Sequence, residues 1–161
     1  MRSFALVLDT NVWHEYAMGD SPEHRSADLI LFAINNGVRL GIAAHSMKDL
    51  FRLLERDMKQ TCNDALPNGA GSPGPAARAV AWGVLERLLE NAEVVGSDYM
   101  DALKAMKYRN MHDFYEDNLV VSACQRMNAD ALVTNDKKLL RHSPVNAMTP
   151  ADALMWLQAE L

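Results

Sequence analysis

The side chains best suited to chemistry in this sequence are aspartates that follow short apolar runs. Asp9 comes directly after the run Phe4–Leu8, and Asp136 comes two residues after the run Ala131–Thr134. Sites built from carboxylates select hard cations such as Mg²⁺ or Mn²⁺, which prefer oxygen ligands and keep water for a substrate. Such a cation lowers the pKa of its water and makes it a nucleophile. The two residues therefore predict metal-assisted hydrolysis.

Asp117 is the aspartate that a structural role explains least well. The predicted helix Glu116–Met127 has an apolar stripe through Val120, Val121 and Cys124, and Asp117 lies on that stripe. A carboxylate that faces the core is costly unless it is paired or bound to a metal. We therefore expect Asp117 to join the two strand-end aspartates in one site.

Two further aspartates are candidates for the same site. Asp113 stands four residues before Asp117 and faces the same way if the helix begins early enough. Asp49 lies in the first turn of the predicted helix Ser46–Lys59, directly after the strand Leu40–Ala44. Both positions are close to the edge of the sheet at which the first two acids are expected.

Every one of these acids except Asp117 also has a specific local structural interpretation. The alternatives are a turn residue for Asp9, a capping box for Ser46 with Asp49 and for Asp113 with Glu116, and an N-cap for Asp136 before a helix Lys137–Arg141. These alternatives would be separate coincidences, whereas one metal site explains all of the positions.

The histidines and glycines do not form a motif of another chemistry. No H-E-x-x-H or Cys/His cluster occurs among His14, His24, His45, His112 and His142, which argues against zinc. The sequence also lacks a P-loop or a G-x-G-x-x-G fingerprint for a nucleotide cofactor. His112 is next to Asp113, and we expect its side chain to be exposed to solvent.

Strands and helices alternate along the chain, and this order predicts the fold. The predicted strands are Phe4–Leu8, Leu40–Ala44, Ala92–Val95, Ala131–Thr134 and, as a fifth, Val145–Met148; the predicted helices are Asp28–Asn36, Ser46–Lys59, Ala76–Glu90, Tyr99–Lys107, Glu116–Met127, Lys137–Arg141 and Ala151–Gln158. Alternation of this kind indicates a three-layer α/β/α fold with a central, mainly parallel sheet of four to five strands. Ligands of such sheets bind beyond the carboxyl ends of the strands, where Asp9 and Asp136 are expected.

Length and composition are consistent with one domain in the cytoplasm. The 161 residues fit a single domain, 1–161, with a flexible loop predicted at 63–75, where prolines and glycines gather. No apolar run approaches the roughly 20 residues of a membrane span. The first apolar run ends in an acid, as a strand does and a signal peptide does not. The two cysteines form no framework of spacings, so we expect a reduced, cytosolic protein.

The net charge of −5 does not by itself favour a nucleic-acid partner, because phosphate contacts need Lys or Arg. Net charge, however, does not describe local patches, and part of the deficit comes from the acids of the predicted site. Candidate phosphate contacts near the rim of that site are Lys48, Arg52, Arg109, Lys137 and Lys138. Each of them also fits an ordinary solvated surface residue.

The acidic segments together resemble the PIN-domain family. Val7-Leu8-Asp9-Thr10-Asn11-Val12 resembles the family's opening motif, and Asp113-Phe114-Tyr115-Glu116-Asp117 resembles its acidic helix start. Ala129-Asp130-Ala131-Leu132-Val133-Thr134-Asn135-Asp136 resembles its late strand and acid. The match spans nearly the whole chain in the right order, and the three segments together are more specific than any one of them.

The resemblance implies an endoribonuclease that depends on Mg²⁺ or Mn²⁺. The family's metal-site acids match Asp9, Asp117 and Asp136, and residues that orient those acids match Asn11 and Thr134. The family commonly has a Glu on the helix after the second strand; this chain has Asp49 there, one methylene shorter. Asp113 is one residue further from Asp117 than an acid often is in the family. The resemblance therefore implies catalytic roles for Asp49 and Asp113 less directly.

Partners and rival functions follow from the same resemblance. Many small PIN proteins are toxins held inactive by an antitoxin. An RNA substrate and an antitoxin protein are therefore the expected partners, and a second copy of the chain, in a homodimer, is a further candidate partner. One rival is a catalytically weakened PIN-like module that binds RNA or protein, which the change at Asp49 and the acidic balance favour. Another is a metal phosphohydrolase acting on small molecules. A haloacid-dehalogenase-like enzyme would need an acid at position 11, which is Asn11.

Overall fold

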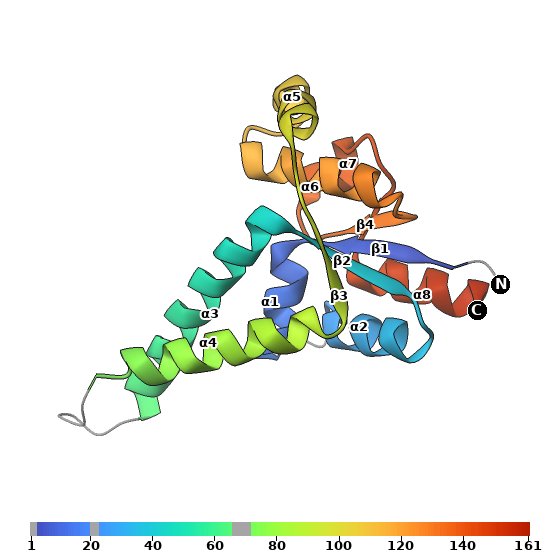
Figure 1. Cartoon of the computed structure of the whole chain (residues 1–161). Helices are drawn as coiled ribbons and strands as arrows, with labels where there is room; N and C mark the ends of the chain where they lie inside the picture. The colour runs from blue at the N-terminus through green and yellow to red at the C-terminus, as the bar shows by residue number, and fades with distance from the viewer. Residues whose placement is uncertain (1–2, 20–22, 66–71) are drawn as a thin grey trace.

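The central layer of the protein is a five-stranded parallel sheet, shown in a computed structural model that describes residues 3–19, 23–65 and 72–161 (Figure 1). The strands are β1 (Ala5–Leu8), β2 (Arg39–Ala43), β3 (Ala92–Val95), β4 (Ala131–Val133) and β5 (Ala147–Met148). The helices are α1 (Thr10–Met18), α2 (Ser26–Asn35), α3 (Ala44–Ala65), α4 (Gly74–Leu89), α5 (Tyr99–Lys107), α6 (Tyr115–Met127), α7 (Lys137–His142) and α8 (Pro150–Glu160), with a 3₁₀ helix at Tyr108–Asn110.

The first strand is the centre of the sheet because its sequence suits burial on both faces. All four residues of β1 are buried. Leu6 and Leu8 pack into one hydrophobic core, and Ala5 and Val7 pack into another on the opposite face, as the alternation of a strand requires. The continuous apolar run that predicted this strand is therefore the signature of a strand covered by helices on both sides.

Two cores on opposite faces of the sheet make the three layers. The larger core contains buried residues of α1, α2, α3, α4 and α8, and the smaller one contains residues of α6 and α7 (Figure 1). On the first face, α3 and α4 pack along each other as a long helical hairpin. The predicted α/β/α architecture with a central parallel sheet is confirmed for the described residues, and the assignment of 1–161 to a single domain stays a prediction.

The order of the strands places a topological switch point beside β1. The order is β3-β2-β1-β4-β5, so the chain builds outward on one side of β1 and then returns to its other side with β4. Leu8 is in register with Val133 across the parallel β1–β4 pair. The segments that leave these two strands therefore start next to each other, at the edge where sheets of this class bind ligands.

One helix was not predicted from the sequence. α1 follows β1 directly, and its first residues, Thr10, Asn11 and Val12, are poor helix formers. Burial of Val12 and Trp13 in the larger core compensates for this weak intrinsic preference. Helix α3 also starts two residues before its predicted bound, and it continues to Ala65 instead of ending at Lys59.

The loop predicted at 63–75 is shorter than expected. Residues 63–65 end α3, and Gly74 and Pro75 begin α4, where proline suits the first turn. Residues 66–71 lie outside the described residues, so the predicted flexibility of this segment stays a prediction. Among the helices described, none has both the length and the apolar character that crossing a bilayer requires.

Candidate active site

An acid-lined pocket of about 380 Å³ lies at the carboxyl edge of the sheet. The acids in its wall are Asp9, Asp49, Glu116, Asp117 and Asp136. They come from four parts of the chain: the end of β1, the start of α3, the start of α6 and the turn between β4 and α7. Hereafter this pocket is called the acidic pocket.

Asp9 is a buried carboxylate in which both oxygens accept hydrogen bonds. Its extended backbone makes it the N-cap of α1, and Oδ1 accepts a bond from the Thr10 N–H at 2.7 Å. Oδ2 accepts bonds from Asn11 Nδ2 at 2.9 Å and from Thr134 Oγ1 at 2.7 Å. Burial raises the pKa of Asp9 against these hydrogen bonds, and repulsion from Asp136 adds to the rise.

A single hydroxyl group connects the ends of the two central strands. Thr134 Oγ1 donates to Asp9 and accepts a bond from the Asp136 N–H at 3.0 Å. Asn11 also reaches across, because its Oδ1 accepts a bond from the Asn135 N–H at 3.3 Å. Thr134 and Asn11 thus both contact the Asp9 carboxylate, as an orienting role requires.

Asp136 is both a helix cap and a member of the acidic pocket. Its Oδ1 accepts bonds from the N–H groups of Lys138 at 2.7 Å and Leu139 at 2.9 Å, which makes it the N-cap of α7. Burial would raise the pKa of Asp136, but these backbone bonds and the nearby His112 outweigh burial and hold the pKa below its ordinary value. The N-cap alternative is therefore correct for one oxygen only, because Oδ2 lies 3.5 Å from His112 Nε2.

Asp117 is held against the ring of His112. Its Oδ2 lies 3.1 Å from His112 Nδ1, and its side chain is 28 % exposed. Burial raises the pKa of Asp117 to about 6; repulsion from Asp9 and Asp136 adds to this rise, and His112 opposes it. Burial therefore disfavours the charged form of Asp117, as its place on the apolar stripe predicted.

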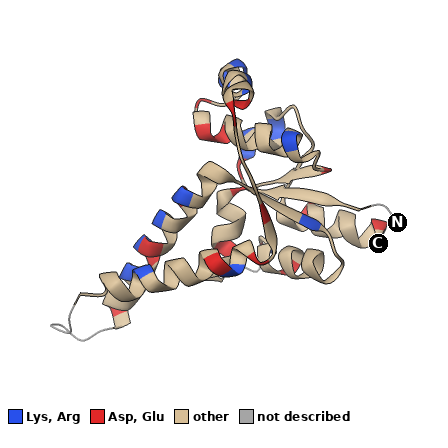
Figure 2. Cartoon of the chain, viewed as in Figure 1, with Lys and Arg blue, Asp and Glu red and all other residues tan. Residues whose placement is uncertain are grey.

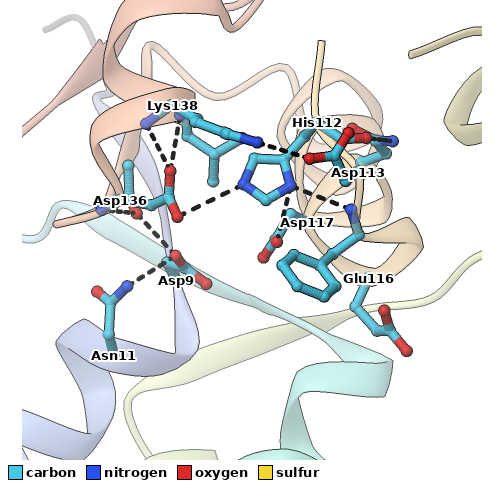
Figure 3. A network of polar contacts seen from close by, with 12 residues as sticks. Asp9, Asn11, His112, Asp113, Glu116, Asp117, Asp136 and Lys138 are labelled. Atoms are coloured by element: carbon cyan, nitrogen blue, oxygen red, sulfur yellow. Dashed lines mark hydrogen bonds and ion pairs between the residues drawn. The ribbon is translucent and has the colours of Figure 1, made fainter. Parts of the chain in front are cut away.

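His112 lies between Asp117 and Asp136 and not in solvent (Figure 3). The expected exposure of this side chain is wrong, because only 3 % of His112 is exposed. The backbone N–H of Phe114 donates to His112 Nδ1 at 3.2 Å, so this nitrogen presents a lone pair. Nδ1 and the Asp117 carboxylate are then two acceptors facing each other, an unfavourable contact unless one of them carries a proton.

The remaining two predicted acids have different environments. Asp49 lines the acidic pocket from the first turns of α3. Asp113 does not line it: its side chain is 77 % exposed, and Oδ2 lies 2.7 Å from Lys138 Nζ (Figure 3). Lys138 holds the pKa of Asp113 below its ordinary value. Because α6 begins only at Tyr115, Asp113 is not on the helical stripe that would turn it inward.

Both capping-box alternatives are wrong. Helix α3 begins at Ala44, so Ser46 lies inside the helix and cannot be its N-cap. The N-cap of α6 is Phe114, which has no side-chain cap hydrogen bond. The pocket position of Asp49 therefore has no capping explanation of the kind considered from the sequence.

Four titratable members of the acidic pocket were not assigned to it from the sequence. They are His14, His45, Arg56 and Glu116. Adjacency to Asp117 was a signal for Glu116, and the position just after β2 was a signal for His45. His14 and Arg56 depend on how α1 and α3 pack against each other, for which the sequence offers no comparable signal.

The donor set of the acidic pocket suits a divalent cation chemically. Carboxylates that raise one another's pKa are the groups that a hard cation would neutralise, and every acid named above offers oxygen. As the side chains are arranged, however, Asp117 and Asp136 both face His112. Within the described part of the chain, no group of three or more His, Cys, Asp or Glu residues is arranged to hold a metal ion.

A parallel sheet with acids gathered at the switch-point edge defines an α/β protein with a carboxylate-based site. The profile of one family, described as the PIN domain, matches residues 5–138. This chain belongs to the PIN-domain family. PIN domains are generally nucleases and typically use divalent metal ions. No curated protein sequence matches the chain.

Two solved structures share the fold. The structure of VapBC2 from Rickettsia felis bound to a DNA fragment from their promoter aligns with a TM-score of 0.58 and 14 % identity, covering 90 % of this chain and 98 % of that one. The structure of PAE2754 from Pyrobaculum aerophilum aligns with a TM-score of 0.61 and 16 % identity, covering 97 % of this chain and 90 % of that one. At these identities the likeness concerns the fold.

Proposed function

We propose that this protein is an endoribonuclease that uses Mg²⁺ or Mn²⁺ to hydrolyse phosphodiester bonds of RNA in the acidic pocket. The observation that carries the proposal is the meeting of Asp9, Asp117 and Asp136 in one pocket of a PIN domain. The alternative local roles do not account for this arrangement. Asp117 is not the N-cap of α6, and of the groups that act on it His112 alone opposes the effect of burial on its pKa.

In this proposal Asp9, Asp117 and Asp136 would hold the cation, and Asp49 would line the position of the substrate. A bound divalent cation supplies an activated water and stabilises the charge that develops on the phosphate. Other residues of the chain orient these carboxylates and hold them in place. Thr134 and Asn11 fix the Asp9 carboxylate, and the N-terminus of α7 fixes one oxygen of Asp136.

Basic residues of α3 are the best candidates for phosphate contacts. Lys48, Arg52 and Arg56 are exposed and follow one another at intervals of about one helical turn along α3, which also carries Asp49 (Figure 2). Arg56 also lines the acidic pocket. Arg56 is paired with Asp57 at 2.6 Å and Lys138 with Asp113 at 2.7 Å, so a phosphate would have to compete with a carboxylate for either of these two cations.

A protein partner that controls the nuclease is part of the proposal. One protein of the same fold, VapBC2, was solved bound to a DNA fragment from their promoter, and the family resemblance implies an antitoxin. The expected location is cytoplasmic, as the reduced cysteines suggest, since Cys62 and Cys124 form no disulfide.

The central test is cleavage of RNA with and without metal. Purified protein should cleave a labelled RNA, stop in EDTA and resume with Mg²⁺ or Mn²⁺, and it should leave a generic phosphate ester untouched. Cleavage that continued in chelator would rule out the metal mechanism. Hydrolysis of the small ester in place of RNA would favour a phosphohydrolase.

Asp117→Asn tests whether the pocket acids bind the metal. The variant removes one charge and keeps the shape, so it should lose cleavage and show a smaller rise in melting temperature on addition of Mn²⁺, which measures binding to the folded state. Asp49→Asn is the graded comparison: it should weaken both effects if Asp49 is a ligand and leave the Mn²⁺ shift intact otherwise. An Asp117→Asn protein that cleaves RNA normally would contradict the assignment.

The alternative is a PIN-like module that binds RNA or protein with little catalysis. Two observations favour it. The acidic pocket has the shorter Asp49 where the family commonly has Glu, and the carboxylates of Asp117 and Asp136 contact His112 instead of converging on one position for a cation. RNA binding without cleavage, in every metal tested, would be the result that selects this alternative.

A further inference from the structure

His45 is a pocket residue whose chemistry the acids do not explain. It is the second residue of α3, directly beyond the carboxyl end of β2, and its half-buried side chain lines the acidic pocket. The charges that act on it include Asp49 of α3 and Asp9 at the end of β1, so its ring is close to acids from two parts of the chain.

The contact of His45 with α6 defines which ring nitrogen carries the proton. His45 Nε2 lies 3.0 Å from the backbone carbonyl oxygen of Glu116. A carbonyl can only accept, so Nε2 is the donor, and in the neutral ring Nδ1 must hold a lone pair. Within the described residues Nδ1 has no hydrogen-bond partner, and it is not among the polar atoms sealed from solvent.

Burial favours the neutral ring. It lowers the pKa of His45 against the opposing effects of the Glu116 carbonyl, Asp49, the Glu116 carboxylate and Asp9. A neutral imidazole whose far nitrogen is held by a carbonyl is a proton acceptor of fixed orientation.

The other two histidines nearby are less suited to this role. His112 is fully buried, and its Nδ1 already accepts the N–H of Phe114. His14 also lines the acidic pocket, but its Nε2 is already paired with Asp57 at 2.9 Å. Asp57 lies within α3 and is not one of the acids that line the pocket. His45 is therefore the histidine that combines an available lone pair with the neighbourhood of the acids.

We propose that His45 is a catalytic residue, the group that accepts the proton of the attacking water in the acidic pocket. The inference rests on the proposed nuclease function. As the water oxygen bonds to phosphorus, its proton passes to His45 Nδ1, and the bond from phosphorus to the leaving oxygen breaks. The leaving oxygen takes up a proton from solvent or from the His45 ring, which completes the hydrolysis without another reactant.

His45→Gln is the decisive variant. The amide nitrogen of Gln can still donate to the Glu116 carbonyl, whereas the basic lone pair is gone. RNA cleavage should fall by about 10²- to 10⁴-fold, the usual contribution of a general base. The Mn²⁺-induced rise in melting temperature should stay as in wild type. Cleavage at the wild-type rate would overturn the proposal and leave His45 as a tether between α3 and α6.

Two comparisons separate this inference from its neighbours. His142→Gln is the control, because His142 is exposed on α7 and is not among the residues that line the acidic pocket. It should change cleavage less than about threefold, and an equal loss in both variants would overturn the proposal. His45→Ala should regain activity when imidazole is added, because imidazole restores the lone pair, and no regain in a folded variant would count against it.

A measurement without turnover tests the geometry directly. In ¹⁵N NMR of the wild-type chain with labelled histidine, the His45 Nδ1 should be unprotonated and Nε2 protonated, and the reverse tautomer would overturn the proposal. If the wild type cleaves no RNA in any metal, the proposed function fails. If it cleaves RNA and His45→Gln does so equally well, only the inference about His45 fails.

Discussion

The acidic pocket and a larger cavity on the first face of the sheet differ in the kinds of side chain that line them. The larger cavity, of about 700 Å³, lies between α1, α2 and α4; apolar side chains such as Trp13, Ile30 and Leu88 line it together with Arg87, Glu90 and Asn91. The acidic pocket has about half that volume, but its carboxylates repel one another and are held by backbone and hydroxyl groups. The volume of a cavity is therefore a weaker indication of a functional site than a group of carboxylates held together at a cost.

The same contrast has an energetic side. Apolar side chains of the larger cavity stabilise the fold by burial, since Ile30 is fully buried and Leu88 is nearly so. Charges of the acidic pocket destabilise it, because burial raises the pKa of Asp9 and Asp117. Substitutions in the two regions should therefore have opposite effects on stability and activity.

The largest effect should come from Asp136→Asn in the acidic pocket. Asn caps a helix as well as Asp does, so α7 should stay folded. Charge stabilisation by a metal contributes several kcal/mol, and the loss of one anionic ligand should slow RNA cleavage by about a thousandfold or more. Far-UV circular dichroism would check that the variant is folded, and cleavage rates would check the loss of activity. A folded variant that stays active would contradict the role given to the acidic pocket.

In the larger cavity, Ile30→Ala should have the opposite effect: it should reduce stability and leave cleavage unchanged. The side chain is fully buried beside existing empty space, so its truncation should cost about 2–5 kcal/mol of unfolding free energy. Cleavage by the folded fraction and the Mn²⁺-induced melting shift should not change. Ile30→Val, in urea unfolding, should cost only about 1 kcal/mol. A variant with normal stability and poor cleavage would place the cavity in the active machinery.

The stability of the protein in EDTA should fall as the pH rises from 4 to 7. The folded pKa of Asp117 is about 6 against an ordinary value of 3.8, so the folded state binds more protons than the unfolded state in this window. Its contribution should be about 2 kcal/mol, allowing for partial exposure. Urea unfolding at several pH values would measure it. Asp117→Asn should flatten the slope and be the more stable protein at pH 7; an unchanged slope would contradict the cause.

The smallest effect should come from Asp113→Asn. The carboxylate is exposed and bound only to Lys138, and surface ion pairs of this kind contribute about 0–1 kcal/mol. Melting temperature and RNA cleavage should both stay close to wild type. A loss comparable to that of Asp136→Asn would return Asp113 to the active site and contradict its observed place outside the acidic pocket.

The sequence predicted the parts of the fold whose signals are local. Continuous apolar runs indicated the five strands, and the acids after two of them indicated the edge of the sheet that bears the acidic pocket. α1 was missed because its residues favour helix weakly and form it through burial of Val12 and Trp13. That burial depends on contacts with α2 and α3, distant in sequence, which no local pattern shows.

The sequence indicated the four aspartates of the acidic pocket, but it did not indicate Glu116 or the histidines. Asp117 was assigned by its place on a helical stripe, a periodic signal that holds wherever the helix packs. His112 precedes that helix and follows a 3₁₀ turn, so its burial depends on a backbone path without a period. Asp113 was misplaced for the same reason, since the helix began two residues too late to turn it inward.

The Thr134 hydroxyl contacts Asp9 and the backbone of Asp136, and this contact limits how early during synthesis the acidic pocket can form. The two aspartates are separated by most of the chain, and Thr134 can join them only after β4 has paired with β1. A ribosome adds about 5–20 residues each second from the N-terminus, so Asp9 emerges long before its partners. The nascent chain therefore lacks a complete acidic pocket until the segment through Asp136 has been synthesised, and under the proposed function it should not cleave the RNA around it during that interval.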